Sequence, residues 1–90
     1  MPVKTRQEVA FEEAEEEAIK EVKASILQAM AYREVTRQEL ADKLDIGLGY
    51  VDQLLGPDPR NMSVRAIARI FNALGFQLYF WAQPEEQGKN

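Results

Sequence analysis

The sequence contains no cysteine and no histidine among its 90 residues. Without them the chain cannot form disulfides, thiolate nucleophiles or Cys/His zinc sites, and it lacks the side chain that most often acts as a general base near neutral pH. Its glycines match neither the GxGxxG nor the Walker pattern that holds phosphate groups. We therefore expect no enzyme activity, no cofactor and no metal.

Long apolar runs are also absent. None approaches the roughly 18 residues that a membrane span needs, and the opening stretch "MPVKTRQEVAFEEAEEE" lacks the basic flank and apolar run of a signal peptide. We expect a soluble cytoplasmic protein without a membrane partner. Ninety residues, 46% of them apolar, are enough for one domain spanning 1–90. An oligomer would add buried surface that so small a core lacks.

The formal net charge is −4, and the acidic side chains are concentrated near the N-terminus. Residues 1–32 carry four basic and seven acidic side chains, whereas residues 33–70 carry six of each. The total charge therefore does not exclude a nucleic-acid partner, because charge distribution matters more than the sum. Six cations of the neutral middle segment are available for one basic face: Arg33, Arg37, Lys43, Arg60, Arg65 and Arg69.

The first predicted helix spans about 6–32, which has no proline or glycine and is rich in good helix formers. Its inward stripe is expected to be Phe11, Ala14, Ala18, Val22, Ile26 and Met30. The acidic part, about 6–20, forms an N-terminal helical extension. Its glutamates at 12, 13 and 15–17 fit a solvated face better than a paired-carboxylate site.

Three shorter helices follow, so that the fold class is a mainly α bundle of about four helices. The spacing from Thr36 to Glu39 predicts a capping box, and the helix that it opens ends at "DIG", residues 45–47. A third helix over about 48–55 ends at Gly56 and the prolines beyond it. A fourth begins after Ser63 and has Gly75 at its stop position.

The second and third helices, separated by a tight turn, form the pattern of a helix-turn-helix. The run "TRQELADKLDIGLGYVDQLL" resembles the Cro/repressor-type (XRE-like) helix-turn-helix family, and "RNMSVRAIARIFNALGFQL" is similar to the segment that follows in short antitoxin-like or phage-type regulators. The resemblance covers roughly 22–78. It implies a homodimeric transcriptional regulator that places its third helix in the major groove of double-stranded DNA. The shared buried set is expected to be Leu40, Ala41, Leu44, Ile46, Val51 and Leu54.

The candidate DNA contacts fall into two groups. At the reading helix, two glycines permit close approach of the backbone, Leu48 can touch a thymine methyl, and Gln53 and Asp52 can pair with adenine and cytosine edges. Arginines around the helix, and the Tyr50 hydroxyl, can meet phosphates. The alternatives are that Tyr50 and Leu48 pack on the core and that the polar groups are ordinary surface. The complete set is Arg37, Gln38, Gly47, Leu48, Gly49, Tyr50, Asp52, Gln53, Arg60 and Arg65.

"FQLYFWA", residues 76–82, predicts a β-strand because most of its side chains are bulky and β-favouring. No second convincing strand exists in the chain, and a lone strand leaves an open edge. The strand is therefore expected to pair with its counterpart in a second copy, giving a two-fold dimer, before a tail at 83–90. The predicted dimer contacts are Phe76, Leu78, Tyr79, Phe80 and Trp81.

A second hypothesis belongs to a different functional class. The acidic N-terminal helix contributes nothing to DNA binding, and it could instead engage a basic partner protein such as a toxin. In that case the helix-turn-helix is degenerate and the chain is an interaction module, antitoxin-like or a phage adaptor. Both activities can also coexist in one protein.

Overall fold

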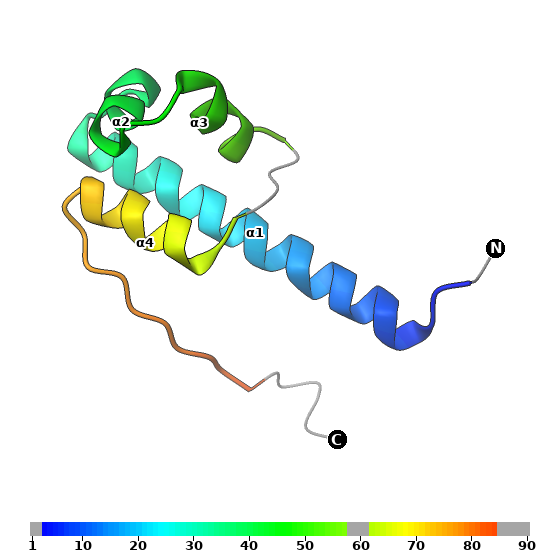
Figure 1. Ribbon diagram of the computed structural model, residues 1–90. Helices are drawn as coiled ribbons and strands as arrows, with labels where there is room; N and C mark the ends of the chain where they lie inside the picture. The colour runs from blue at the N-terminus through cyan, green and yellow to red at the C-terminus, as the bar shows by residue number, and fades with distance from the viewer. Residues whose placement is uncertain (1–2, 58–61, 85–90) are drawn as a thin grey trace.

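The computed structural model describes residues 3–57 and 62–84. Four helices form a small bundle (Figure 1), which confirms the mainly helical class and the four predicted helices at nearly the predicted bounds. None of these helices combines the length and the apolar character that crossing a membrane requires. The helices are α1 (Arg6–Arg33), α2 (Arg37–Leu44), α3 (Leu48–Leu54) and α4 (Val64–Ala73).

Side-chain caps mark where α1, α2 and α4 begin, whereas α3 begins after Gly47 without one. The Thr36 hydroxyl accepts from the Glu39 backbone N–H at 3.1 Å, and the Glu39 carboxylate accepts from the Thr36 N–H at 2.8 Å, which confirms the predicted capping box. Thr5 and Glu8 form a second box at the start of α1. These hydrogen bonds hold the pKa of Glu8 and of Glu39 below the ordinary value, because they stabilise the charged carboxylate. Ser63 caps α4 as predicted.

The turns after α2 and α4 depend on left-handed backbone. Asp45 ends α2 with φ of 57°, and its N–H donates back to the last turn, so "DIG" stops the helix through a residue type that tolerates this region. Gly75 follows α4 with φ of 83°, the conformation for which glycine is favoured. The chain then turns sharply, with the Phe76 N–H donating to the Phe71 carbonyl at 2.8 Å.

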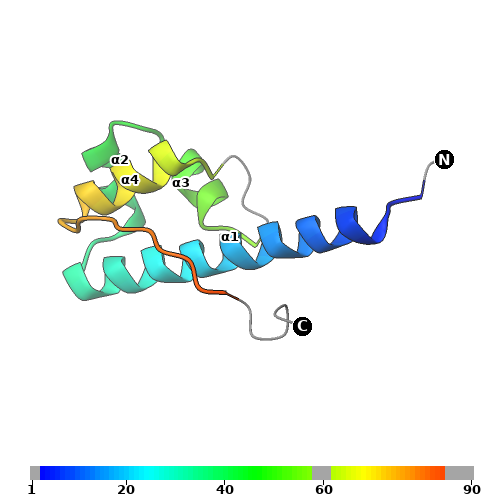
Figure 2. The ribbon, with the colours of Figure 1, turned by 90° about the horizontal axis from the view of Figure 1, so that it is seen from below.

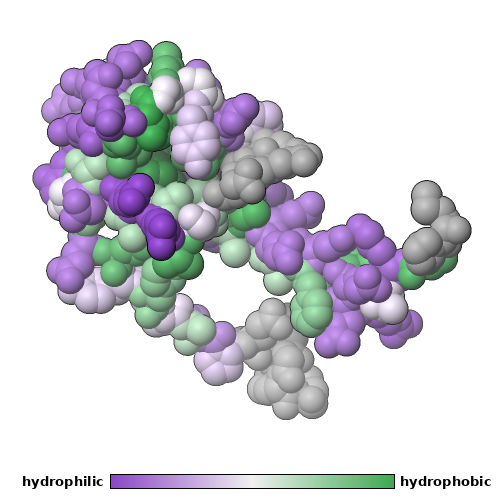
Figure 3. All heavy atoms as spheres, viewed as in Figure 1, coloured by the Kyte–Doolittle hydropathy of each residue, from purple (hydrophilic) through white to green (hydrophobic). Residues whose placement is uncertain are grey.

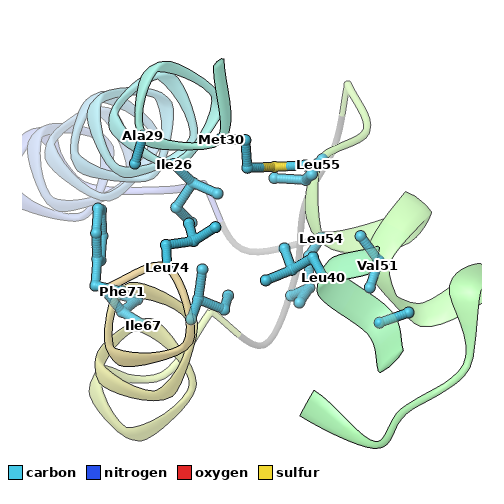
Figure 4. Close-up of a cluster of buried hydrophobic side chains, with 12 residues drawn as sticks. Ile26, Ala29, Met30, Leu40, Val51, Leu54, Leu55, Ile67, Phe71 and Leu74 are labelled. Atoms are coloured by element: carbon cyan, nitrogen blue, oxygen red, sulfur yellow. The ribbon is translucent and has the colours of Figure 1, made fainter. Parts of the chain in front are cut away.

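All four helices contribute to one core (Figure 4). The most completely buried large side chains come one from each helix, namely Ile26, Leu40, Val51 and Ile70. Detaching any one helix would expose its buried apolar side chain to water, which is unfavourable. Burial of Val51 therefore holds the short helix α3 against the bundle. The remaining core members are Ala29, Met30, Ala41, Leu54, Leu55, Ile67, Phe71 and Leu74.

The predicted inward stripe of α1 is correct only in its C-terminal half. Ile26 and Met30 are buried and Val22 is half-buried, but Phe11 is 58% exposed. The reason is length: a helix of 28 residues is about 42 Å long, whereas α2 to α4 have ten residues or fewer and cannot cover it. Figures 1 and 2 show the N-terminal half of α1 extending alone beyond the bundle.

The segment 76–84 is extended but forms no strand, and none is assigned anywhere in 3–57 or 62–84. A strand exists only when it hydrogen-bonds to a neighbour, and one copy of the chain supplies no neighbour. The predicted strand is therefore absent from the single chain. Phe76 and Leu78 pack against the core, whereas the three aromatic side chains that follow are mostly exposed: Tyr79 (70%), Phe80 (65%) and Trp81 (80%).

Candidate nucleic-acid interface

The turn from α2 and two buried side chains hold one face of α3 against the bundle. The turn between the helices is closed by the Ile46 N–H, which donates to the Ala41 carbonyl at 3.0 Å. Val51 and Leu54 then anchor α3, with 1% and 3% of their surface exposed. Both anchors were predicted from the sequence, and they leave the opposite face of α3 turned to solvent.

That outward face carries Gly49, Asp52 and Gln53, and Leu48 and Tyr50 flank it on either side. Leu48 is 39% exposed and Tyr50 43%, and Asp52 and Gln53 are exposed as well. A Cβ atom built at Gly49 would meet nothing within 4 Å, and the same holds at Gly47. The glycines are therefore not required by packing inside the molecule, and the space in front of them is open to a partner.

An ion pair joins the two helices in a way that the sequence analysis missed. Arg37 at the start of α2 donates through Nη1 to Asp52 Oδ1 of α3 at 3.1 Å, and both side chains stay about half exposed. The sequence assigned Arg37 to a phosphate and Asp52 to a base, as separate contacts. No spacing rule could link them, because they are fifteen positions apart and a turn lies between them. The pair neutralises the only charged side chain on α3.

Gln38, the neighbour of Arg37, is engaged along its own helix. Its amide donates to Asp42 Oδ1 at 3.0 Å, one helical turn further on. Gln38 is exposed, so that it can still exchange this contact for another acceptor.

The start of α4 brings two further cations to α3. A hollow of about 210 Å³ lies between these helices, and Tyr50 lines it together with Arg65 and Arg69. Arg65, a predicted phosphate contact, thus lies beside α3, and so does Arg69, which was not in the predicted set. Its place could have been found from helical spacing, because it follows Arg65 by one turn of α4. Arg60 lies outside the described residues.

Arg33 does not belong to a DNA-facing surface, although the charge distribution included it. Its Nε donates to the Leu74 carbonyl at 2.9 Å and its Nη2 to the Gly75 carbonyl at 3.2 Å. The guanidinium carbon also lies 4.8 Å from the ring centroid of Phe76 and 5.2 Å from that of Tyr32. Arg33 therefore fastens the end of α4 to α1 and sets the direction in which the segment 76–84 leaves.

Comparison of the chain with protein-family models, with curated proteins and with solved structures returns no match. A functional assignment therefore rests on the residues of the α3 face and the groups around it.

Proposed function

We propose that the protein is a sequence-specific DNA-binding transcriptional regulator that acts as a homodimer and places α3 in the major groove of double-stranded DNA. The observation that carries this proposal is the division of α3 into two faces. Val51 and Leu54 bury one face of α3 in the core. The opposite face is exposed, and its one charged side chain is Asp52. A short helix held in this way against a preceding helix is the arrangement that enters a major groove in helix-turn-helix proteins.

The base contacts come from the uncharged part of the face. Gly49 lets the helix approach the groove closely, which brings Leu48 to the methyl group of a thymine and Gln53 to the N6 and N7 atoms of an adenine. Each good bidentate pair is worth about 1–3 kcal/mol of discrimination. Asp52 serves first as the partner of Arg37, so that its contact with a cytosine amino group is secondary.

The phosphate contacts come from the edge of the face. Arg65 beside Tyr50 provides one cation and a hydroxyl donor, and Arg37 provides a second cation when it releases Asp52. With roughly two to four phosphates neutralised by each subunit, the logarithm of the affinity falls with the logarithm of the salt concentration by about 0.9 for each contact. Two subunits are needed for useful affinity at physiological salt.

The dimer of this proposal uses the segment 76–84. Its backbone is already extended in the single chain, and Tyr79, Phe80 and Trp81 are exposed to an extent unusual for such large apolar side chains. Antiparallel pairing with the same segment of a second copy supplies the missing ladder and covers these side chains. A two-fold axis there presents two copies of α3 to half-sites about one helical turn apart.

The proposal is tested by fluorescence anisotropy with labelled duplexes of random sequence, titrated at low and at physiological salt. Binding should weaken with salt, and Arg65→Ala should lower the low-salt affinity. Lys20→Ala is the matched control, because it also removes one positive charge from an exposed position but lies on α1. If the wild-type protein does not bind at low salt, or if both variants behave alike, the proposal fails.

A further inference from the structure

The N-terminal part of α1, residues 6–19, projects beyond the bundle and is here called the acidic overhang. All of its side chains are exposed except Ile19, which is half-buried. Figure 3 shows it covered mainly by hydrophilic side chains, with apolar ones among them. It carries six glutamates and one arginine. Its side-chain hydrogen bonds with the described residues outside it come from Lys4, which pairs with Glu12, and from the cap residue Thr5, which bonds to Glu8.

The overhang nevertheless has a face that continues the buried face of α1. Glu15, Phe11 and Glu8 lie roughly three, four and five helical turns before Ile26, on the same side of the helix. Phe11 is 58% exposed there. Glu13, in contrast, lies two positions from Glu15 and points to nearly the opposite side. The overhang thus presents an exposed aromatic side chain flanked by two carboxylates, of which Glu8 is bonded to Thr5 in the helix cap.

A groove of complementary character lies on the far side of α4. It is a hollow of about 600 Å³ between the end of α2, the outer face of α4 and the segment after α4, and here it is called the α2–α4 groove. Leu44, Phe76 and Leu78 give it apolar walls, and Lys43 and Arg69 are its charged members. The described residues that line it include no carboxylate.

The overhang cannot reach the groove of its own chain. The C-terminal half of α1 packs against the Ile67 and Phe71 side of α4, whereas Arg69 lies on the opposite side of that helix. The overhang continues α1 in a single unbroken helix that leads away from the bundle, as Figures 1 and 2 show. An acidic helix that fills the groove must therefore come from another molecule.

We propose that the α2–α4 groove binds the acidic overhang of a second copy of this chain, with Phe11 on the apolar walls and Glu15 facing Arg69 and Lys43. The two surfaces match in charge sign, and each is an apolar surface with a charged rim. In a two-fold dimer each copy gives its overhang and receives the other, so that both surfaces are covered at once.

This contact deepens the dimer of the proposed function and supplements the pairing of the segments 76–84, which border the same groove. Its test does not involve DNA binding: Phe11, Glu15 and Lys43 are assigned no base or phosphate contact, and Arg69, which also lines the hollow beside Tyr50, is tested in the absence of DNA. A failed docking contact therefore leaves the DNA-binding proposal standing.

The test is a charge exchange followed by sedimentation equilibrium at low salt. Glu15→Lys and Arg69→Glu should each raise the dimer dissociation constant at least about tenfold, and the double variant should return it to within about threefold of wild type. Glu13→Lys makes the same charge change on the other side of the overhang and should leave dimerisation unchanged. All three positions are exposed, so that folding should not be affected.

A second measurement separates docking of the overhang from pairing of the C-terminal segments. The chain has no cysteine, so Gln7→Cys accepts a single spin label at the tip of the overhang. Mixed with isotope-labelled wild-type protein, it should broaden the amide signals of Lys43 and Arg69 across the dimer. The proposal is overturned if those signals stay sharp, if Glu13→Lys acts like Glu15→Lys, if the exchanged pair fails to recover, or if the wild-type chain is monomeric and only a foreign basic protein binds the overhang.

Discussion

Gly49→Ala should change stability and DNA binding in opposite directions. Gly49 lies in the first turn of α3 with ordinary helical backbone, and an added Cβ meets nothing within 4 Å. Alanine therefore fits without strain, and it lowers the conformational entropy of the unfolded chain. Glycine inside a helix costs about 0.5–1 kcal/mol relative to alanine, and the lower figure applies this near the helix start. We expect a gain of about 0.5 kcal/mol.

The assays are thermal unfolding followed by circular dichroism, and anisotropy with a bound duplex. For a domain of this size the gain corresponds to a rise in Tm of about 2–4 °C. In the complex the new methyl group occupies the space through which α3 approaches DNA. Overpacking of this kind costs about 1–3 kcal/mol, which weakens binding by about 5- to 150-fold.

Ser25→Ala is the matched control, because it also replaces an exposed helical residue by alanine but lies on α1, away from α3. It should raise Tm without affecting DNA binding. Gly49→Ala protein that is more stable yet binds DNA as wild type does would refute the role of this glycine at the groove. A fall in the Tm of Gly49→Ala would show that the space around Gly49 does not accept a Cβ atom.

Three further predictions concern groups around the site. Asp52→Asn frees Arg37 for a phosphate, so that DNA affinity rises at low salt and the salt slope steepens by up to about 0.9, as titrations at several salt concentrations would show. Because the pKa of Glu39 is lowered in the folded protein, its carboxylate contributes stability that is complete above pH 4.5 and is lost as the pH falls through the folded-state pKa. Glu39→Gln keeps the cap with Thr36 but has no carboxylate to titrate, so that its Tm should fall less than that of the wild type when the pH is lowered. An equal fall in Tm would show that the capping box contributes nothing. Arg33→Ala removes two hydrogen bonds and should cost about 1–2 kcal/mol in urea unfolding, with Arg33→Lys recovering only part of the loss.

The helices of this protein could be predicted closely because their ends are encoded locally. Thr36 with Glu39, Ser63 and Gly75 each act within one turn of their own helix, and such signals are read directly from sequence. The anchors of α3 followed from helical periodicity in the same way. These local signals predicted the ends of the helices and the buried anchors of α3, Val51 and Leu54.

The features that were missed all depend on separate parts of the chain meeting. The apolar pattern of α1 continues to Phe11, and only the short length of the other helices decides that the core ends before it. Arg37 and Asp52 meet because the turn between α2 and α3 brings them together. Arg33 finds its acceptors, the Leu74 and Gly75 carbonyls, about forty positions away at the end of α4. A strand at 76–82 needs a partner that sequence patterning cannot supply.

The central claim is that the exposed face of α3 reads DNA in a symmetric dimer. Selection of bound duplexes from a random pool by the purified protein tests it most directly. The account predicts enrichment of a palindrome whose half-sites are centred about 10–10.5 base pairs apart, and loss of preference at one position of each half-site with Gln53→Ala. The claim would be contradicted if the wild-type protein enriched no sequence. It would also be contradicted if the Gln53→Ala variant enriched the same sequences as the wild type.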